Sequence, residues 1–286
     1  MILLYSMITT RGCPYSCTFC YRNFGRKVRS RSANNVIAEI KTLREKYNLR
    51  FIALLDELFT VHKKRVYDFC DKIDEEKLNI RWQCAGRVNL VDESLLKRMA
   101  ASGCEFILYG IESGSQKMLD SMNKQVTVDQ AKKAIQITRK AGITPMTSYM
   151  VGTIGETKET IQETVDFCRD THTNAGEFFF TTPFPTTILW EQVKAMGKIE
   201  NEEKYIEKLG ECSDFLINLT ELPDEELISL KEEAENEISK NYKEYQKYML
   251  RHHPFKVMSQ YYRIFGFRNL LKRAVEVGAL RKPVKF

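Results

Sequence analysis

The stretch YSMITTRGCPYSCTFCYRN, residues 5–23, joins a short apolar run to three closely spaced cysteines. Its first residues have the length and composition of a buried β-strand. Cys13, Cys17 and Cys20 follow directly, at the spacing C-x3-C-x2-C. In parallel α/β proteins the loops that leave the carboxyl ends of the strands build the functional site. This stretch therefore indicates both a fold class and the place where chemistry is expected.

Outward from this stretch, short apolar runs alternate with longer amphipathic segments up to about residue 181. The predicted strands are residues 5–9, 51–55, 80–85, 106–111, 144–151 and 177–181. The predicted helices begin after Ser32, Asp92 and Thr127, and at about residue 158. Strict alternation requires right-handed crossovers and a parallel sheet. Because about six units are present where a full barrel has eight, we predict an α/β fold, a partial (βα)6 TIM-like barrel.

The pattern changes after about Pro183, where an acidic segment precedes a long helix. Pro223 opens this helix, and His252, His253 and Pro254 end it. The remaining residues are aromatic and basic and predict one or two short helices. We therefore expect two domains, residues 1–185 as the partial barrel and residues 186–286 as a helical C-terminal extension.

The composition is that of an enzyme-sized globular chain, with 286 residues, 43% hydrophobic and 29% charged. It excludes disordered and collagen-like chains. No run of about eighteen apolar residues occurs, and Met1 is not followed by a basic lead or a small-residue cleavage site. We therefore expect no membrane span, no secretion and a cytoplasmic location.

The net charge of +6 is unevenly distributed. Residues 200–237 contain fourteen acids and three bases, whereas residues 240–286 contain twelve bases and two acids. A basic tail can attract phosphates, but a solvated helix face explains most such charges. Nucleic-acid binding is therefore the less favoured interpretation.

Thiolates of the cysteine triad suit either an iron–sulfur cluster or zinc. A structural zinc site needs a fourth ligand, and the sequence has no second C-x2-C or C-x2-H pair. A fourth thiolate would have to come from an isolated cysteine: Cys70, Cys84, Cys104, Cys168 or Cys212. Three ligands on a four-iron cluster leave one iron open to a substrate or cofactor, which favours catalysis over storage.

The triad directly after the first predicted strand, with Phe19 before the last cysteine, resembles the radical SAM superfamily. The resemblance implies that Cys13, Cys17 and Cys20 hold a 4Fe-4S cluster, whose fourth iron chelates S-adenosylmethionine (SAM). It also implies that Phe19 belongs to the cofactor site. An electron donor such as flavodoxin or ferredoxin is the expected partner.

Two further motifs follow the second and third predicted strands. In LLDELFT, residues 54–60, the resemblance implies that Asp56 or Glu57 contacts the methionine ammonium of SAM, because a carboxylate suits that group. Which of the two makes the contact stays open, and adjacent loop acids can equally be solvated. In WQCAGRVN, residues 82–89, Arg87 could pair with the SAM carboxylate or with an acid across the site.

The run GIESGSQ, residues 110–116, resembles the group that includes cobalamin-dependent methylases, methylthiotransferases and the elongator-type acetyltransferase subunit. It implies that Glu112 and Ser113 bind the ribose hydroxyls or the methionyl part of SAM. After the fifth strand, GTIGET resembles the G-x-P-G-E-T segment and adds Gly152 to the cofactor site, although Ile154 replaces the usual proline. This departure puts the loop geometry in doubt more than cofactor binding.

The resemblance implies an enzyme that reductively cleaves SAM to a 5′-deoxyadenosyl radical, which acts on an unknown substrate by methyl or group transfer. No catalytic side chain is predicted. Only twelve residues precede Cys13, so cobalamin is not expected within this chain, and a fragment or half of a split enzyme stays open. The rival interpretation is a non-catalytic zinc or iron–sulfur interaction protein whose basic tail binds RNA or a partner. A truncated, non-functional barrel is the third.

Overall fold

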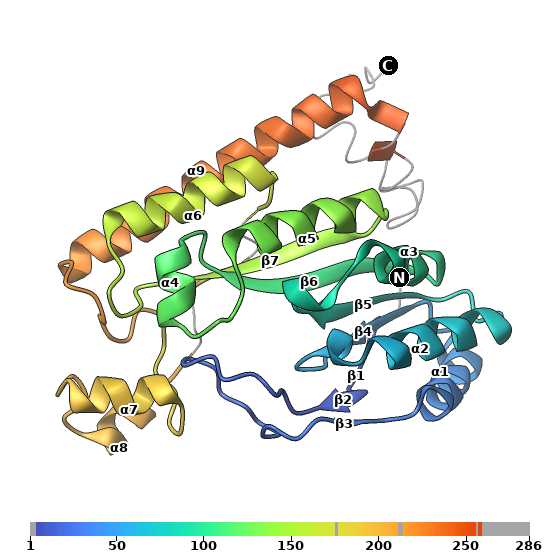
Figure 1. Cartoon of the computed structure of the whole chain (residues 1–286), viewed down its shortest axis with the longest axis horizontal. Helices are drawn as coiled ribbons and strands as arrows, with labels where there is room; N and C mark the ends of the chain where they lie inside the picture. The colour runs from blue at the N-terminus through green and yellow to red at the C-terminus, as the bar shows by residue number, and fades with distance from the viewer. Residues whose placement is uncertain (1–3, 175–176, 211–213, 256, 259–286) are drawn as a thin grey trace, which may run out of the picture.

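The computed structural model describes residues 4–174, 177–210, 214–255 and 257–258 (Figure 1). Its main sheet has six parallel strands in the order β1-β4-β5-β6-β7-β8. They are β1 (Leu4–Met7), β4 (Phe51–Leu54), β5 (Arg81–Gly86), β6 (Cys104–Glu112), β7 (Thr144–Val151) and β8 (Glu177–Phe180). Each coincides with a predicted strand. The sheet curls into an open half-barrel, so the predicted partial barrel is confirmed.

Helices follow the strands. They are α1 (Ala33–Tyr47), α2 (Lys63–Glu75), α3 (Glu93–Ala101), α4 (Gln116–Ser121), α5 (Val128–Lys140) and α6 (Lys158–Thr171), with short 3-10 turns η1 (Phe59–Val61) and η2 (Val88–Leu90). The predicted starts are confirmed, because Ser32, Asp92 and Thr127 each accept a backbone N–H from the first turn of their helix. Helix α2 is absent from the predicted elements. His62 before it makes no side-chain cap bond, so the sequence offers no start signal.

The alternation of side chains along each strand positions the core. In β5, Trp82 and Cys84 are buried, whereas Gln83 between them is partly exposed. The buried face packs against the helices, and the Trp82 ring lies 5.3 Å from the Phe69 ring of α2, edge to face. The partly exposed residues lie on the opposite, concave face of the half-barrel.

The C-terminal part begins with α7 (Ile188–Ala195) and α8 (Glu202–Glu207) and continues into α9 (Asp224–His252). Helix α9 has the predicted bounds and runs beside α6 in Figure 1. Its buried Leu227, Ala234 and Ile238 belong to the same apolar core as the sheet. Residues 259–286, which contain most of the predicted short helices, lie outside the described residues. No helix in the described part of the chain is long and apolar enough to cross a membrane.

Candidate functional site

The three cysteines lie on one loop between the short antiparallel strands β2 (Thr10–Arg11) and β3 (Arg29–Ser30). The loop opens at Gly12, whose φ of +90° favours glycine, and a Cβ there would lie 2.3 Å from the Lys27 carbonyl oxygen. The Cys13 N–H bonds to the Gly25 carbonyl at 3.1 Å, which closes the loop on itself. This backbone hydrogen bond therefore fixes the shape of the loop that carries the three thiols.

The thiols of the triad are free and close enough to influence one another electrostatically. Cys17 is buried, and the other two are partly exposed. Burial, with the neighbouring Cys17 and Cys13, raises the pKa of Cys20 to about 11. Burial likewise raises the pKa of Cys13. Both thiols are therefore protonated at neutral pH until a bound metal displaces the proton.

The chemistry of the three thiols fits an iron–sulfur cluster. Among the described residues, no three His, Cys, Asp or Glu side chains converge as the ligands of one metal ion do. An iron–sulfur cluster makes a different demand, because each thiolate binds a separate iron atom. Three free thiols spread around one closed loop meet that demand.

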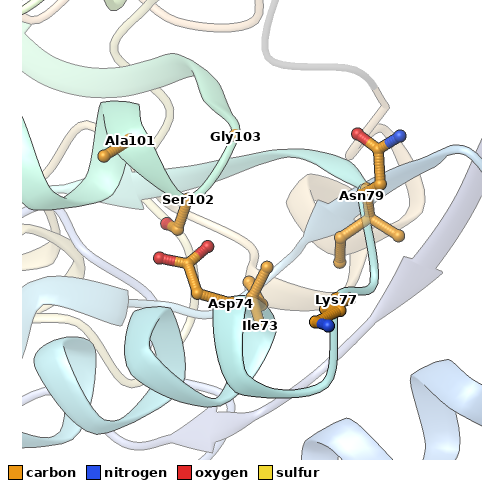
Figure 2. Close-up of a pocket in the computed structure, with 8 residues that line it drawn as sticks. Ile73, Asp74, Lys77, Asn79, Ala101, Ser102 and Gly103 are labelled. Atoms are coloured by element: carbon orange, nitrogen blue, oxygen red, sulfur yellow. The ribbon is translucent and has the colours of Figure 1, made fainter.

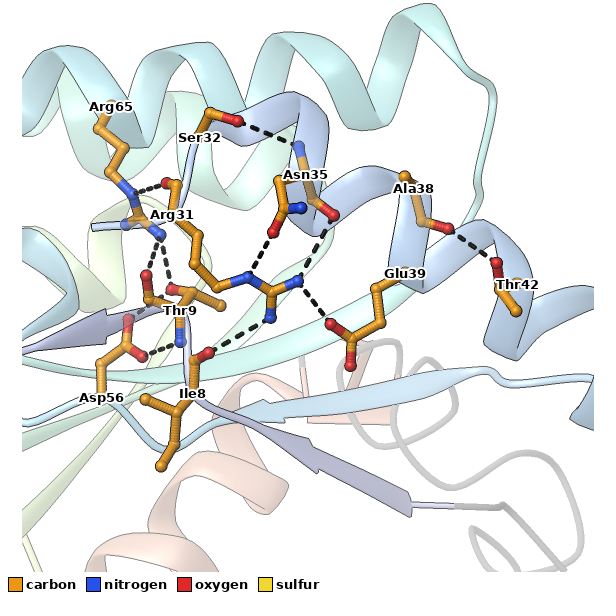
Figure 3. Close-up of polar contacts among 10 residues, drawn as sticks. All are labelled: Ile8, Thr9, Arg31, Ser32, Asn35, Ala38, Glu39, Thr42, Asp56 and Arg65. Atoms are coloured by element: carbon orange, nitrogen blue, oxygen red, sulfur yellow. Dashed lines mark hydrogen bonds and ion pairs between the residues drawn. The ribbon is translucent and has the colours of Figure 1, made fainter. Parts of the chain in front are cut away.

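Asp56 anchors the entry to the loop (Figure 3). Its carboxylate accepts the Thr9 N–H at 2.5 Å, the Thr10 N–H at 2.8 Å and the Thr9 hydroxyl at 2.6 Å. Arg65 of α2 donates to the same Thr9 hydroxyl at 2.6 Å and to the Thr9 carbonyl at 3.2 Å. This buried network fixes the end of β1 against β4 and α2. Arg65 and the two threonines are not among the predicted site residues, because only the fold brings them to Asp56.

Glu57 holds both ends of the loop. Its carboxylate accepts the Gly12 N–H at 2.6 Å and, more weakly, the Phe24 N–H at 3.5 Å. The two adjacent acids therefore bind backbone donors on opposite sides of the cysteines. That one of them contacts the SAM ammonium stays a prediction.

Arg87 lies at the carboxyl end of β5, directly against the cysteine loop. Its guanidinium stacks on Tyr15 at 3.7 Å from the ring centroid, and Nη1 lies 3.7 Å from the Cys17 Sγ. Nε donates to Asn89 Oδ1 at 3.1 Å. The structure thus brings Arg87 to the triad, while its pairing with the SAM carboxylate stays a prediction.

Glu112 ends β6 with a φ of +71° and pairs with Lys124 at 2.6 Å, both side chains being buried. Gly110 makes room for this pair, because a Cβ there would lie 2.3 Å from Glu112 Oε1. The Lys124 ammonium also lies 5.7 Å from the Phe19 ring centroid. Lys124 is not among the predicted site residues, and its one sequence signal is its place twelve residues after Glu112.

Phe19 joins the cysteine loop to two apolar clusters. One consists of Met118, Met122 and Met150, and the other surrounds Trp190 of α7. Ile154 also contacts the Trp190 cluster and therefore packs the turn after β7 against it.

Ser113 is fully buried against α6. Its hydroxyl lies 3.1 Å from the Thr164 hydroxyl, which also accepts the Gly114 N–H at 2.9 Å. A Cβ at Gly114 would lie 2.5 Å from the Glu163 carbonyl oxygen. In this arrangement Ser113 shapes the turn after β6, and a direct contact with SAM stays a prediction.

Gly152 begins the turn after β7 with a φ of +80°. Its N–H bonds to the Glu156 carboxylate, which also accepts the Thr153 N–H at 3.2 Å. Burial raises the pKa of Glu156 to about 7. The turn is thus closed by an acid that lies within it.

Two other surfaces differ in their position relative to the cysteine loop. A cavity of about 310 Å³ lies at the amino ends of β5 and β6, away from the cysteine loop. Figure 2 shows residues that line it, among them Asp74, Lys77 and Gly103. Arg98 pairs with Asp74 at 2.8 Å, so that acid is satisfied. On the concave face beside the loop, by contrast, Leu55 is 57% exposed. The carboxyl ends of the strands therefore combine apolar surface with the cysteines.

The family model described as the radical SAM superfamily matches residues 7–168, more than half of the chain. An uncharacterized methyltransferase of Pyrococcus horikoshii is 35% identical over 187 residues, which are 65% of this chain and 41% of that protein. The anaerobic magnesium-protoporphyrin IX monomethyl ester cyclase of Rubrivivax gelatinosus is 33% identical over 198 residues, 68% of this chain and 36% of the cyclase. The chain thus spans less than half the length of these relatives.

Solved structures share the fold. The methyltransferase TsrM of Kitasatospora setae, solved with cobalamin and a [4Fe-4S] cluster, is 20% identical with a TM-score of 0.61, over 68% of this chain and 40% of TsrM. The family match begins at Met7, the last residue of β1, includes the cysteine loop and ends at Cys168 within α6. The chain, with its cysteine triad at the carboxyl end of an open parallel half-barrel, belongs to the radical SAM superfamily.

Proposed function

We propose that this chain is the radical-generating core of an enzyme that transfers a methyl or another group to a substrate of unknown identity. The observation that carries the proposal is the loop with three free thiols, tied at both ends by buried and half-buried carboxylates. It lies where the parallel strands end, which is where such folds build their sites. Relatives named methyltransferase and cyclase support the reaction class.

Membership of the superfamily implies a 4Fe-4S cluster and SAM as cofactors. In the proposal Cys13, Cys17 and Cys20 ligate three of the four irons. When bound, these cofactors supply one-electron reductive cleavage of SAM to a 5′-deoxyadenosyl radical. The protein supplies ligation, orientation and exclusion of water. The buried Cys17 and the apolar packing of Phe19 serve the last of these.

The SAM site in this proposal lies along the ends of β4 to β7. The Glu112 carboxylate, which also pairs with Lys124, can accept a hydrogen bond from a hydroxyl or ammonium group of SAM. Phe19 supplies an apolar wall beside it. Gly152 acts through the turn that it begins after β7, where its φ of +80° favours glycine. Ser113 acts through the turn that it shapes, and Asp56 and Glu57 act through the loop that they hold.

The concave face, with its exposed Leu55 and Met146, is the proposed substrate side. A flavodoxin or ferredoxin is the proposed electron donor. All seven cysteines in the described part of the chain are free, which supports a reducing compartment such as the cytoplasm. Residues 1–185 are assigned to radical generation and residues 186–286 to a helical extension of unassigned role.

The test is anaerobic reconstitution with iron and sulfide, followed by reduction and addition of SAM without substrate. The expected result is about four irons per chain and slow formation of 5′-deoxyadenosine. Cys17→Ala should abolish this cleavage and leave the far-UV circular dichroism unchanged. Cys168→Ala is the matched control, because Cys168 is a buried thiol of α6 outside the cysteine loop. This variant should retain iron and activity.

Undiminished cleavage in Cys17→Ala would refute the assignment of the triad. Wild-type protein that binds no cluster, and binds about one zinc instead, would return the chain to the interaction-protein hypothesis.

A further inference from the structure

Arg87 stands apart from the other polar groups around the cysteine loop because it contacts a sulfur atom of the triad. Nη1 lies 3.7 Å from the Cys17 Sγ, within reach of a hydrogen bond to sulfur. Asp56 and Glu57 instead accept hydrogen bonds from the Thr9 hydroxyl and from backbone N–H groups at the ends of the loop. The guanidinium is therefore the polar group best placed to act on a cluster ligand.

The guanidinium is held in a fixed orientation. Tyr15, which lies between two cysteines, stacks on it at 3.7 Å, and Asn89 accepts Nε–H at 3.1 Å. Stacking requires the planar guanidinium, which a lysine ammonium cannot replace. The backbone N–H of Arg87 is itself bonded to the Thr60 hydroxyl at 3.4 Å. Ring, amide and backbone together keep Nη1 directed at the sulfur.

The groups that Arg87 bonds to or stacks on are neutral. The residue is only 7% exposed, and Nη2 is buried without a hydrogen-bond partner in the described part of the chain. Its bonded and stacked partners are a thiol, an amide and a ring. A buried cation is costly unless an anion lies near it. A thiolate-ligated cluster supplies such an anion, and its sulfur atoms supply acceptors for the free N–H groups.

We propose that Arg87 raises the reduction potential of the cluster by donating Nη1–H to the Cys17 sulfur and by placing a buried positive charge beside it. The inference rests on the proposed function. Reduction adds one negative charge to the cluster, and a nearby cation stabilises the reduced state more than the oxidised state, especially where water is excluded. Hydrogen bonds to cluster sulfurs act in the same direction. Arg87 is thus a positioning and tuning residue that acts through Cys17.

The experiment measures the midpoint potential of the reconstituted full chain without SAM, by anaerobic titration followed by EPR of the reduced cluster. Arg87→Met should lower the ratio of reduced to oxidised cluster at least tenfold at a fixed potential, which corresponds to 59 mV for one electron. Arg87→Gln keeps a donor without the charge and should give an intermediate change. Arg139→Met is the matched control, because Arg139 of α5 also lies over a tyrosine, Tyr245, but donates to the carbonyls of Thr171 and His172 rather than to a sulfur. It should leave the ratio unchanged.

A wild-type potential in Arg87→Met or Arg87→Gln would overturn the inference, and weaker SAM binding at that unchanged potential would assign Arg87 to the SAM carboxylate instead. Folded variants that bind no cluster at all would also overturn it and assign Arg87 to holding the loop. Absence of a cluster in the wild-type chain is a separate outcome, because it refutes the proposed function itself.

Discussion

Two acidic turns at the carboxyl end of the same sheet act over very different distances along the chain. Asp56, after β4, accepts hydrogen bonds from Thr9 and Thr10, which are 47 and 46 residues away. Glu156, after β7, accepts from Gly152 and Thr153, which are four and three residues away. Both carboxylates are almost fully buried. One ties distant segments together, and the other closes its own turn.

The two acids also differ in their electrostatic surroundings. Asp56 lies close enough to Arg65 for the two charges to interact, and Arg65 shares the Thr9 hydroxyl with it. Glu156 has backbone donors but no cation among the causes that set its pKa, so burial dominates and raises that pKa to about 7. Glu156, without a cation nearby, is therefore protonated over part of the physiological pH range.

Removal of Asp56 should have the largest effect. Asp56→Ala leaves the N–H groups of Thr9 and Thr10 without an acceptor and Arg65 without its neighbouring charge, so we expect a loss of about 3–4 kcal/mol in the free energy of unfolding. Urea denaturation measures it, and iron per chain after reconstitution should fall as well. Asp68→Ala, at an exposed i,i+4 pair, is the control. Full iron content in Asp56→Ala would show that the loop does not need this anchor.

Glu156 should give a pH-dependent effect. The folded-state pKa of about 7 exceeds the ordinary value of 4.5, so its stabilising contribution is complete below pH 4.5 and lost as the pH rises through 7. Glu156→Gln removes this titration. The unfolding free energy of the variant relative to wild type should therefore rise by up to about 3 kcal/mol between pH 4.5 and 8.

Urea denaturation of both proteins at several pH values measures that difference, because the other titrating groups cancel. A difference in unfolding free energy that does not vary with pH would show that Glu156 is not a buried carboxylate without a compensating charge. Iron content should be the same in both proteins, in contrast to Asp56→Ala.

Substitution of Glu57 should lower the stability less than substitution of Asp56, and its main effect should be on how firmly the loop holds iron. Glu57→Gln weakens the charge-assisted bond to the Gly12 N–H, for an expected loss of about 1–2 kcal/mol in unfolding free energy. The loop should then release iron to a chelator several-fold faster than wild type. Glu45→Gln, at an exposed position of α1, is the control. Equal release rates in all three proteins would remove Glu57 from the anchors of the loop.

The turn after β6 should give the smallest effect. Thr164→Val removes the acceptor of the Gly114 N–H and the partner of the Ser113 hydroxyl, for an expected loss of about 1 kcal/mol. Thr42→Val on the exposed side of α1 is the matched control. Thermal unfolding compares the stability of the two variants. SAM affinity should fall in Thr164→Val and stay unchanged in Thr42→Val. An unchanged affinity would separate this turn from the cofactor site.

The strands and most barrel helices follow from local signals. Apolar runs predicted all six strands, and caps such as Thr127 predicted where helices begin. Helix α2 lacks such a cap. The strands β2 and β3 span two residues each, too short for any periodic signal. The division at residue 185 stays a prediction, although Leu227 of α9 lies in the same core as the sheet.

Most of the candidate site residues could be named from motifs, but their partners could not. Arg65 and Lys124 lie outside the motifs that predicted the site, and Arg87 contacts a cysteine 70 residues away. Long-range pairs depend on which strand ends lie side by side. Local sequence patterns do not predict the order of the strands in the sheet.

By itself, the sequence determined the open α/β half-barrel and the identity and position of the cysteine triad. Periodicity, caps and the spacing of the thiols depend on neighbouring residues only. Tertiary structure alone decided that Asp56 and Glu57 bind the loop backbone, that Ser113 faces Thr164 and that Arg87 points at Cys17. The physical reason is that a side chain's partners are set by the packing of the parallel strands. Packing brings together groups that are far apart in sequence, and burial then strengthens the contacts between them.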